Sequence, residues 1–219
     1  MTKQDVRARI EEIGIIPAVR VSSVEEALFA AASLLKGGIK VVEITTTMSG
    51  AVEVIAELTR TMPEMIVGAD AVLDVETAGA CLDAGARFLT SPGLDLDIVE
   101  LGVAHNVLVI PGALTPSEVA AACRAGTDFI KVFPCSLVGG ASYIKALKGP
   151  FPHVAFIASG GVNQQTAGDF IRAGASALGI GEHLVPPEAI HRRNATWILE
   201  LTRRFMGVVQ DARAQGKRG

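Results

Sequence analysis

The sequence predicts a closed barrel of eight parallel strands alternating with helices, a (β/α)8 barrel. Short runs rich in β-branched residues recur eight times along the 219 residues. The starts of successive runs lie about 20 to 26 residues apart, which is the length of one strand, one turn and one helix. The chain length is also typical of barrels that form one domain, which commonly have about 200–250 residues.

Eight predicted strands account for these runs. They begin at Ile15, Ile39, Met65, Arg87, Val107, Asp128, Val154 and Ser176. Four of the segments between them end in Gly-Gly or Ala-Gly just before the next strand, as expected where a glycine closes a helix in the left-handed conformation. Eight such units favour a closed barrel. The alternative, an open doubly wound sheet, lacks the G-x-G-x-x-G expected after its first strand.

Additional helices are predicted at both ends of the chain. Residues 1–14 are charged and amphipathic, and we expect an extra helix there that plugs the bottom of the barrel. Ser22 and Glu25 have the spacing of a capping box before the next helix. Another helical stretch follows about residue 188. We therefore expect residues 1–219 to form one domain, with the Arg- and Gly-rich residues 212–219 as a frayed basic tail.

Composition limits the classes of partner. The chain has 20 basic and 23 acidic residues, a net charge of −3, so no electrostatic footprint for nucleic acid is predicted. No apolar run approaches the roughly 20 residues of a membrane span, and we expect no membrane partner. The three cysteines are odd in number and widely spaced, which favours free thiols in a reducing cytoplasm over a disulfide framework.

The sixth predicted strand, DFIKVFP, carries a lysine on its inward face. Ile130 and Val132 suit the outer face, where a barrel strand meets helices, so Phe129, Lys131 and Phe133 point into the barrel. Burial lowers the pKa of a lysine and makes its neutral amine a nucleophile toward a carbonyl group. The alternative is a lysine paired with a buried carboxylate, because structural ion pairs also perturb pKa values.

Three more charged residues are predicted at the carboxyl ends of strands, where the active site of such a barrel lies. Glu43 shares an inward face with Val41 and Thr45, and it is either a proton relay or a static partner of the lysine. Arg20 reaches the same rim, where its guanidinium suits a substrate carboxylate or a salt bridge to Glu43. Asp70 places a second acid in the site.

Two glycine-rich turns follow the last two predicted strands. Ser159-Gly160-Gly161 follows the seventh strand, and Gly179-Ile180-Gly181 closes the eighth. In barrels of this kind, these loops often bind phosphate through backbone N–H groups and a helix N-terminus. Two such turns on neighbouring strands predict an anion site beside the lysine.

Several sequence segments resemble one known family. The strings PAVRV, GGIKVVEIT, SPGLD, IPGALTPSE, IKVFPCSLVGG, KALKGPFPHV and SGGVN occur in this order. They are similar to 2-keto-3-deoxy-6-phosphogluconate aldolases, a family that includes 4-hydroxy-2-oxoglutarate aldolases and 2-keto-3-deoxy-6-phosphogalactonate enzymes. The resemblance covers roughly residues 5 to 185 and is most specific from Lys131 to Pro152.

The resemblance implies a cytoplasmic homotrimer of TIM barrels, a lyase of carbohydrate metabolism that uses neither a metal nor a cofactor. Lys131 matches the Schiff-base lysine, Glu43 the acid/base and Arg20 an arginine near the pyruvate carboxylate. Thr47 stands where many members carry a second arginine, and Thr45 is a further candidate for a hydroxyl contact. Other matches shape the pocket or form the phosphate-binding turns: Pro92, Pro111, Phe133, Gly160, Gly161 and Gly181.

Two positions depart from the family pattern. Gly68-Ala69-Asp70-Ala71 stands where members usually read Gly-Ala-Gly-Thr, so the hydroxyl that touches the pyruvate carboxylate is lost and an acid is gained. Glu182 stands where members usually have serine, and a glutamate there repels a phosphate dianion. Both departures count against the usual phosphorylated substrate, and neither changes the chemistry expected of the lysine.

We therefore expect a class I aldolase, a carbon–carbon lyase. It would cleave a 2-keto-3-deoxy (phospho)sugar acid or 4-hydroxy-2-oxoglutarate to pyruvate and an aldehyde through a Schiff base on Lys131. The alternative is a non-catalytic or redirected barrel of the same family that binds a keto acid without turning it over.

Overall fold

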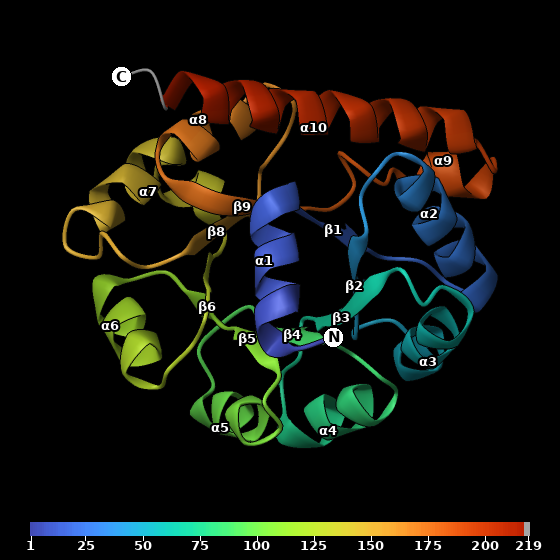
Figure 1. The fold of residues 1–219 in the computed structure, drawn as a ribbon, viewed down its shortest axis with the longest axis horizontal. Coiled ribbons are helices and arrows are strands. Elements are labelled where there is room, and N and C mark those ends of the chain that lie inside the picture. The colour runs from blue at the N-terminus through green and yellow to red at the C-terminus, as the bar shows by residue number, and fades with distance from the viewer. Residues whose placement is uncertain (217–219) are drawn as a thin grey trace.

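The computed structural model, which describes residues 1–216, is a barrel of parallel strands inside a ring of helices (Figure 1). The strands are β1 (Ile15–Val19), β2 (Val41–Thr45), β3 (Ile66–Asp70), β4 (Phe88–Thr90), β5 (Leu108–Ile110), β6 (Gly112–Ala113), β7 (Ile130–Val132), β8 (Phe156–Ser159) and β9 (Ala175–Ile180). The α-helices are α1 (Lys3–Ile13), α2 (Val24–Lys36), α3 (Ala51–Thr61), α4 (Val75–Asp83), α5 (Leu96–Ala104), α6 (Pro116–Arg124), α7 (Ala141–Lys148), α8 (Ala167–Arg172), α9 (Pro187–His191) and α10 (Ala195–Gly216), and a short 3-10 helix, η1, spans Cys135–Val138.

The barrel closes at its fifth predicted strand, which the structure divides in two. The strand order is β5-β4-β3-β2-β1-β9-β8-β7-β6, and only Pro111 separates β5 from β6 in the chain. Proline has no N–H to donate to a strand ladder, but its carbonyl accepts a hydrogen bond from the Lys131 N–H at 2.9 Å. The order follows the chain around the barrel without a reversal. The (β/α)8 prediction is confirmed, and the doubly wound alternative is wrong.

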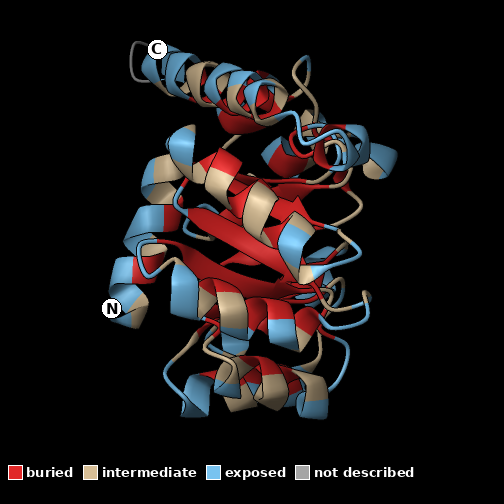
Figure 2. Ribbon diagram, turned by 90° about the vertical axis from the view of Figure 1, so that its right-hand side faces the viewer, coloured by how far each residue is buried: buried red, intermediate tan, exposed pale blue. Residues whose placement is uncertain are grey.

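Alternation along the strands produces two apolar clusters. Ile130 and Val132 belong to an outer cluster between strands and helices, whereas Phe129 belongs to an inner cluster on the barrel axis. The strands are buried except at Ser176 in β9, and the exposed residues lie mainly on the outer faces of the helices (Figure 2). The predicted division of this strand into inward and outward faces is therefore confirmed.

Helix α1 covers the amino-terminal opening of the barrel, as the sequence predicts (Figure 1). Its buried residues Val6 and Ile10 pack on the inner cluster. Higher in the barrel, the ring of Phe88 fills the space beside Gly68, where even an added Cβ would collide with the ring. The bottom of the barrel is thus a closed apolar floor.

The helices end at the predicted glycines, but the predicted N-cap of one helix is wrong by one residue. Gly85 and Gly174 follow α4 and α8 with φ of 99° and 105°, which is the left-handed closure expected. The cap of α2 lies one residue later than predicted, because the Ser23 side chain accepts the Glu26 N–H. The Glu26 carboxylate then turns back to Ser22.

The carboxyl-terminal segment differs from the predicted frayed tail over residues 212–216. Helix α10 continues to Gly216, and Ala212 is buried. Arg213 donates hydrogen bonds to the carbonyl oxygens of Glu11, Glu12 and Ser176, which ties this end to the barrel. Residues 217–219 of the predicted tail lie outside the described residues. No helix within residues 1–216 is long and apolar enough to cross a membrane.

The floor formed by α1 generates a stability prediction. Ile10 is fully buried, and removing such a side chain typically costs about 2–5 kcal/mol. We expect Ile10→Ala to lower the free energy of unfolding, measured by urea denaturation, by an amount in that range. Gln4→Ala, at an exposed position of the same helix, is the matched control and should have little effect. Equal effects of the two substitutions would contradict the plug assignment.

Candidate active site

A cavity of about 380 Å³ opens at the carboxyl ends of the strands, directly above the apolar floor. Eleven residues singled out from the sequence line it: Arg20, Glu43, Asp70, Pro92, Lys131, Phe133, Ser159, Gly160, Gly161, Gly181 and Glu182. They come from strands or strand-following loops around the barrel. The closed barrel therefore brings these positions, which lie up to 162 residues apart in the sequence (182 − 20), to one cavity.

Lys131 is the central cation of this cavity. Its side chain is 6% exposed, and its Nζ lies 2.7 Å from Oδ1 of Asp70, which is 2% exposed. The other carboxylate oxygen of Asp70 accepts a hydrogen bond from the Thr45 hydroxyl at 3.3 Å, and the Phe133 ring centroid lies 5.6 Å from Nζ. The amine thus has one close anionic partner, which a nearby hydroxyl helps to hold.

The charge state of Lys131 differs from the sequence-based expectation. Burial favours the neutral amine, but the negative charges of Glu43 and Asp70 outweigh burial and raise the pKa of Lys131 above its usual value. The predicted neutral nucleophile is therefore wrong for the resting site. The alternative, pairing with a buried carboxylate, describes the resting site, and the carboxylate is Asp70.

Glu43 is buried in the same cavity and forms no salt bridge within the described residues 1–216. Oε2 of Glu43 accepts a hydrogen bond from the Thr90 hydroxyl at 2.9 Å. Burial, and secondarily the charge of Asp70, raises the pKa of Glu43 to about 7, although Lys131, Thr90 and Arg20 act in the opposite sense. A carboxyl group with this pKa can accept or release a proton near neutral pH, which is what a general acid/base requires.

Arg20 lies at the rim of the cavity rather than in its interior. It follows β1 directly and is exposed. Within residues 1–216 no ion pair joins Arg20 to Glu43, so the salt-bridge alternative for this arginine is not formed. Its guanidinium remains available to an anion that enters the cavity.

The two glycine turns form another wall of the cavity, after the neighbouring strands β8 and β9. Gly160 and Gly161 have φ of 84° and 81°, and Gly181 accepts hydrogen bonds from the N–H groups of Leu184 and Val185. The N–H groups of Gly160, Gly161 and Glu182 make no hydrogen bond within residues 1–216. Glu182 itself is exposed at the cavity edge. The wall therefore offers free donors with a carboxylate beside them.

Three predicted residues lie elsewhere. Pro111 does not line the cavity, because its carbonyl instead holds the backbone of Lys131. Thr47 is exposed and lines a neighbouring cavity of about 340 Å³, which also contains Thr45 and Arg20. The predicted role of Pro111 in shaping the pocket is therefore indirect, and the position of Thr47 is corrected to this second cavity.

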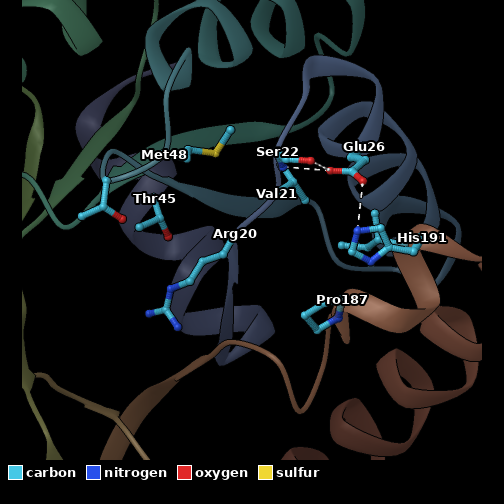
Figure 3. A pocket seen from close by; sticks show the side chains of 10 residues that line it. Arg20, Val21, Ser22, Glu26, Thr45, Met48, Pro187 and His191 are labelled. Atoms are coloured by element: carbon cyan, nitrogen blue, oxygen red, sulfur yellow. Dashed lines mark hydrogen bonds and ion pairs between the residues drawn. The ribbon is translucent and has the colours of Figure 1, made fainter.

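The neighbouring cavity lies between the loops after β1 and β2 and helix α9 (Figure 3). One side of it carries a chain of polar contacts, in which Ser22 donates to Glu26 and Glu26 approaches Nε2 of His191 at 3.7 Å. Arg20 points away from this chain (Figure 3). Arg20 lines both cavities, so the two are adjacent, whereas Thr45 lines only this second one.

Sequence reasoning missed two polar residues of the site. The Thr90 hydroxyl donates a hydrogen bond to Glu43. The sequence signal for Thr90 was its inward-facing position in β4, two residues after Phe88. His183 lines the cavity next to Glu182, and only its place after the last glycine turn pointed to it. Threonine is common in strands, so its residue type alone carried little information.

Comparisons with known proteins agree with this geometry. The sequence model of the KDPG and KHG aldolase family matches residues 6–201. The 2-dehydro-3-deoxy-phosphogluconate aldolase of Treponema pallidum is 30% identical over 91% of this chain and 95% of its own. The KHG/KDPG aldolase of Escherichia coli K12 is 31% identical over 86% of this chain and 89% of its own.

A solved structure is similar over almost the whole chain. The KDPG aldolase of Legionella pneumophila, with pyruvate captured at low pH as a covalent carbinolamine intermediate, has a TM-score of 0.85. It is 31% identical, and the match covers 90% of this chain and 96% of that one. The fold and the sequence thus point to the same family.

The raised pKa of Glu43 predicts a pH-dependent stability. Because its folded pKa of about 7 exceeds the usual 4.5, the carboxyl group stabilises the fold fully below about pH 4.5, and this stabilisation is lost as the pH rises through about 7. We expect wild type to lose about 2–3 kcal/mol relative to Glu43→Gln between pH 5 and 8. Urea unfolding of both proteins at the two pH values measures the difference, and a pH-independent difference would contradict the raised pKa.

Proposed function

Because this chain belongs to the KDPG and KHG aldolase family, we propose that it is a class I aldolase whose nucleophile is Lys131. It cleaves a 2-keto-3-deoxy (phospho)sugar acid or 4-hydroxy-2-oxoglutarate to pyruvate and an aldehyde. The observation that carries the proposal is the single buried lysine amine of the cavity, set between two carboxyl groups at the carboxyl ends of the strands. A lysine in this setting forms imines with ketones.

Covalent chemistry begins at the amine of Lys131. Once deprotonated, it attacks the C2 ketone of the substrate, and loss of water leaves a protonated imine. The imine nitrogen is an electron sink, because the electron pair of the breaking C3–C4 bond can move into it. The apolar floor of Phe88, Phe129 and the α1 side chains lies beneath this centre and limits access from below.

Glu43 is the proposed general acid/base for carbon–carbon cleavage. Its carboxylate accepts the proton of the C4 hydroxyl as the C3–C4 bond breaks, which releases the aldehyde and leaves an enamine. The same proton then returns to C3, and hydrolysis of the new imine releases pyruvate. A group with a pKa of about 7 can carry a proton in both directions near neutral pH.

Arg20 is the proposed anchor of the substrate carboxylate. It is the exposed arginine at the rim of the cavity, and its guanidinium has no carboxylate partner within residues 1–216. A guanidinium fork binds a carboxylate through two parallel hydrogen bonds. Pro92, Phe133 and Ser159 also line the cavity and complete the proposed substrate-binding set.

The far end of the substrate is proposed to lie against the glycine turns. The unused N–H groups of Gly160 and Gly161 suit a phosphate or another anion, and Gly181 closes the same wall. Glu182 beside them opposes a dianion. We therefore propose that an unphosphorylated or shorter 2-keto acid is preferred.

The Lys131–Asp70 ion pair favours a second candidate function, a family member that binds a keto acid without turning it over. An ammonium held by Asp70 at 2.7 Å is not nucleophilic until it loses a proton. A protein of this kind would bind pyruvate and form no imine. Covalent trapping distinguishes the two candidates.

We propose that the chain assembles as a homotrimer. Three exposed leucines support an assembly surface near the mouth of the barrel. They are Leu73 after β3, Leu96 at the start of α5 and Leu137 after β7, with exposures of 63%, 55% and 81%. Contiguous exposed apolar patches mark protein–protein contacts, and these three leucines are the proposed contribution of this end of the barrel.

The proposed compartment is the cytoplasm. Cys81 and Cys135 are buried free thiols, and Cys123 is an exposed one. Burial raises the pKa of Cys81 to about 11 and that of Cys135 to about 12, so both stay protonated and unreactive. Unpaired thiols of this kind persist in a reducing environment.

Borohydride reduction in the presence of pyruvate tests the nucleophile. We expect a covalent adduct on Lys131 in wild type and none in Lys131→Ala, because imine formation requires the primary amine. Lys148→Ala is the matched control. Burial lowers the pKa of Lys148, but its amine donates to the Val154 carbonyl away from the cavity. The site of modification is mapped by peptide mass spectrometry.

Two results would contradict the proposed nucleophile: an adduct that persists in Lys131→Ala, or wild type without an adduct at any pH. Lys131→Ala leaves Asp70 buried without its partner, so its fold is checked by circular dichroism. The double variant Lys131→Ala/Asp70→Asn removes both charges and repeats the test without this destabilisation.

Glu182→Ser tests the substrate preference. Allowing for solvent at the mouth of the barrel, repulsion between Glu182 and a phosphate costs about 1–2 kcal/mol, which is roughly tenfold in binding. We expect the substitution to raise kcat/KM for 2-keto-3-deoxy-6-phosphogluconate about tenfold and to change that for 4-hydroxy-2-oxoglutarate little. Efficient cleavage of the phosphorylated substrate by wild type, unchanged in the variant, would show that Glu182 points away from the substrate.

A further inference from the structure

Asp70 contacts the reacting nitrogen more closely than any other carboxylate of the cavity. Its Oδ1 lies 2.7 Å from Nζ of Lys131, whereas Glu43 makes no hydrogen bond or salt bridge to that nitrogen within residues 1–216. We propose that Asp70 is the catalytic acid/base for forming and hydrolysing the imine, and that Glu43 serves the carbon–carbon step. This inference rests on the proposed Schiff-base function.

The hydrogen bonds of the two acids separate their roles. Oδ2 of Asp70 receives the Thr45 hydroxyl, so Oδ1 is directed at Nζ of Lys131. Oε2 of Glu43 receives the Thr90 hydroxyl from β4. Glu43 and Asp70 are both 2% exposed, and their positions on β2 and β3 differ by one inward layer, because Glu43 pairs with Gly68 and Thr45 pairs with Asp70. Asp70 therefore sits one layer nearer the mouth of the barrel, where a substrate enters.

Imine formation needs a group that moves protons from nitrogen to oxygen, and Asp70 touches that nitrogen. Its carboxylate first takes a proton from the Lys131 ammonium, and the freed amine attacks the C2 carbonyl carbon. The carbonyl oxygen receives this proton from Asp70, which gives a carbinolamine hydroxyl. Asp70 then takes a second proton from the nitrogen and delivers it to the hydroxyl, which leaves as water.

These transfers balance. The ammonium and the ketone become a protonated imine and one molecule of water, and Asp70 begins and ends as a carboxylate. At the end its negative charge faces the positively charged imine nitrogen, as it faced the ammonium before. Hydrolysis of the product imine is the same sequence in reverse. Glu43 is left free to accept the C4 hydroxyl proton in the cleavage step.

Charge also favours a role for Asp70 at the lysine nitrogen over a role in binding the substrate carboxylate. In the resting site, both oxygens of Asp70 are already engaged, one by Lys131 and one by Thr45. An anionic substrate is repelled by a bare carboxylate, but the Lys131 cation offsets the Asp70 charge. Arg20 at the rim is then the remaining cation for the substrate carboxylate. In this proposal Asp70 contacts the lysine nitrogen and the C2 oxygen of the substrate, and not the substrate carboxylate.

Two isotope exchanges with pyruvate separate the two acids. Oxygen-18 from water enters the C2 carbonyl of pyruvate slowly through the spontaneous hydrate and, on the enzyme, through the carbinolamine and imine. Oxygen exchange here means the rate above this enzyme-free background. Deuterium from water enters the methyl group only after the imine has also lost a carbon-bound proton. Measuring both rates on the full chain reports the imine step and the carbon proton step independently.

We expect Asp70→Asn to lower the oxygen exchange about 10²-fold or more, the usual cost of a lost general acid/base. Its deuterium exchange should fall in parallel, because that reaction needs the imine. Glu43→Gln should retain most of the oxygen exchange while losing deuterium exchange. Asparagine keeps the size of Asp70 and an oxygen that can accept from Lys131, so a purely structural role would survive this substitution.

Chemical rescue provides a second readout. In Asp70→Ala, added formate can enter the vacated space and carry the same protons, so we expect oxygen exchange to rise with formate concentration. The same addition to Glu43→Gln should leave its deuterium exchange unchanged. Circular dichroism confirms folding, and Asp70→Thr serves in the comparison if the asparagine variant unfolds.

The outcomes are distinguishable. Wild type that neither exchanges oxygen nor is trapped by borohydride overturns the proposed aldolase function itself. Wild type that exchanges oxygen while Asp70→Asn exchanges as fast or faster overturns only the inference, and Asp70 is then a static partner that holds Lys131 protonated. Loss of oxygen exchange in Asp70→Asn together with formate rescue in Asp70→Ala supports it.

Discussion

The central constraint on this molecule is the burial of the Lys131 amine on the axis of the barrel. An ammonium taken out of water without a partner is costly, and Asp70, 2.7 Å away, offsets that cost. Removing either member of such a buried pair leaves an uncompensated charge. The position of the lysine therefore requires an acid on a different strand, and the closed barrel brings the end of β3 within reach of β7.

The rest of the barrel supports this pair from below and behind. Helix α1 and the inner aromatic side chains seal the bottom, so the amine is reached from the mouth alone. Pro111 separates β5 from β6 along the chain, and its carbonyl accepts a hydrogen bond from the backbone N–H of Lys131. Closure of the barrel and placement of the nucleophile thus depend on the same residue. Replacement of a strand N–H by proline is tolerated here because the break lies at the seam where the sheet closes.

Two acids in one cavity acquire different properties from their surroundings. Within residues 1–216, Glu43 has a hydroxyl partner and forms no ion pair, and burial raises its pKa to about 7. Asp70 has the lysine as its partner and a threonine on its other oxygen. One carboxyl group is thereby suited to moving protons near neutral pH, and the other is bound to the nitrogen at which the covalent chemistry begins. At the glycine turns after β8 and β9, Glu182 adds a negative charge to a surface of free backbone donors, and this charge bears on the choice of substrate.

Local rules were enough to predict the eight strands, the inward face of Lys131 and Glu43 and the glycine-closed helices, because alternation and glycine conformation are properties of short segments. They also predicted the helical plug. The partner of Lys131, the hydroxyl on Glu43, the place of Thr47 in a second cavity and the anchoring of residues 212–216 by Arg213 were decided only by the tertiary structure. Each of these depends on a distance between residues on different elements, and a hydrogen bond or ion pair acts over a few ångströms that no spacing along the chain specifies. The protonation of Lys131 followed the same rule. Burial on its strand predicted a lowered pKa and a neutral amine, but the charges of Glu43 and Asp70, the latter 61 positions away, raise its pKa instead.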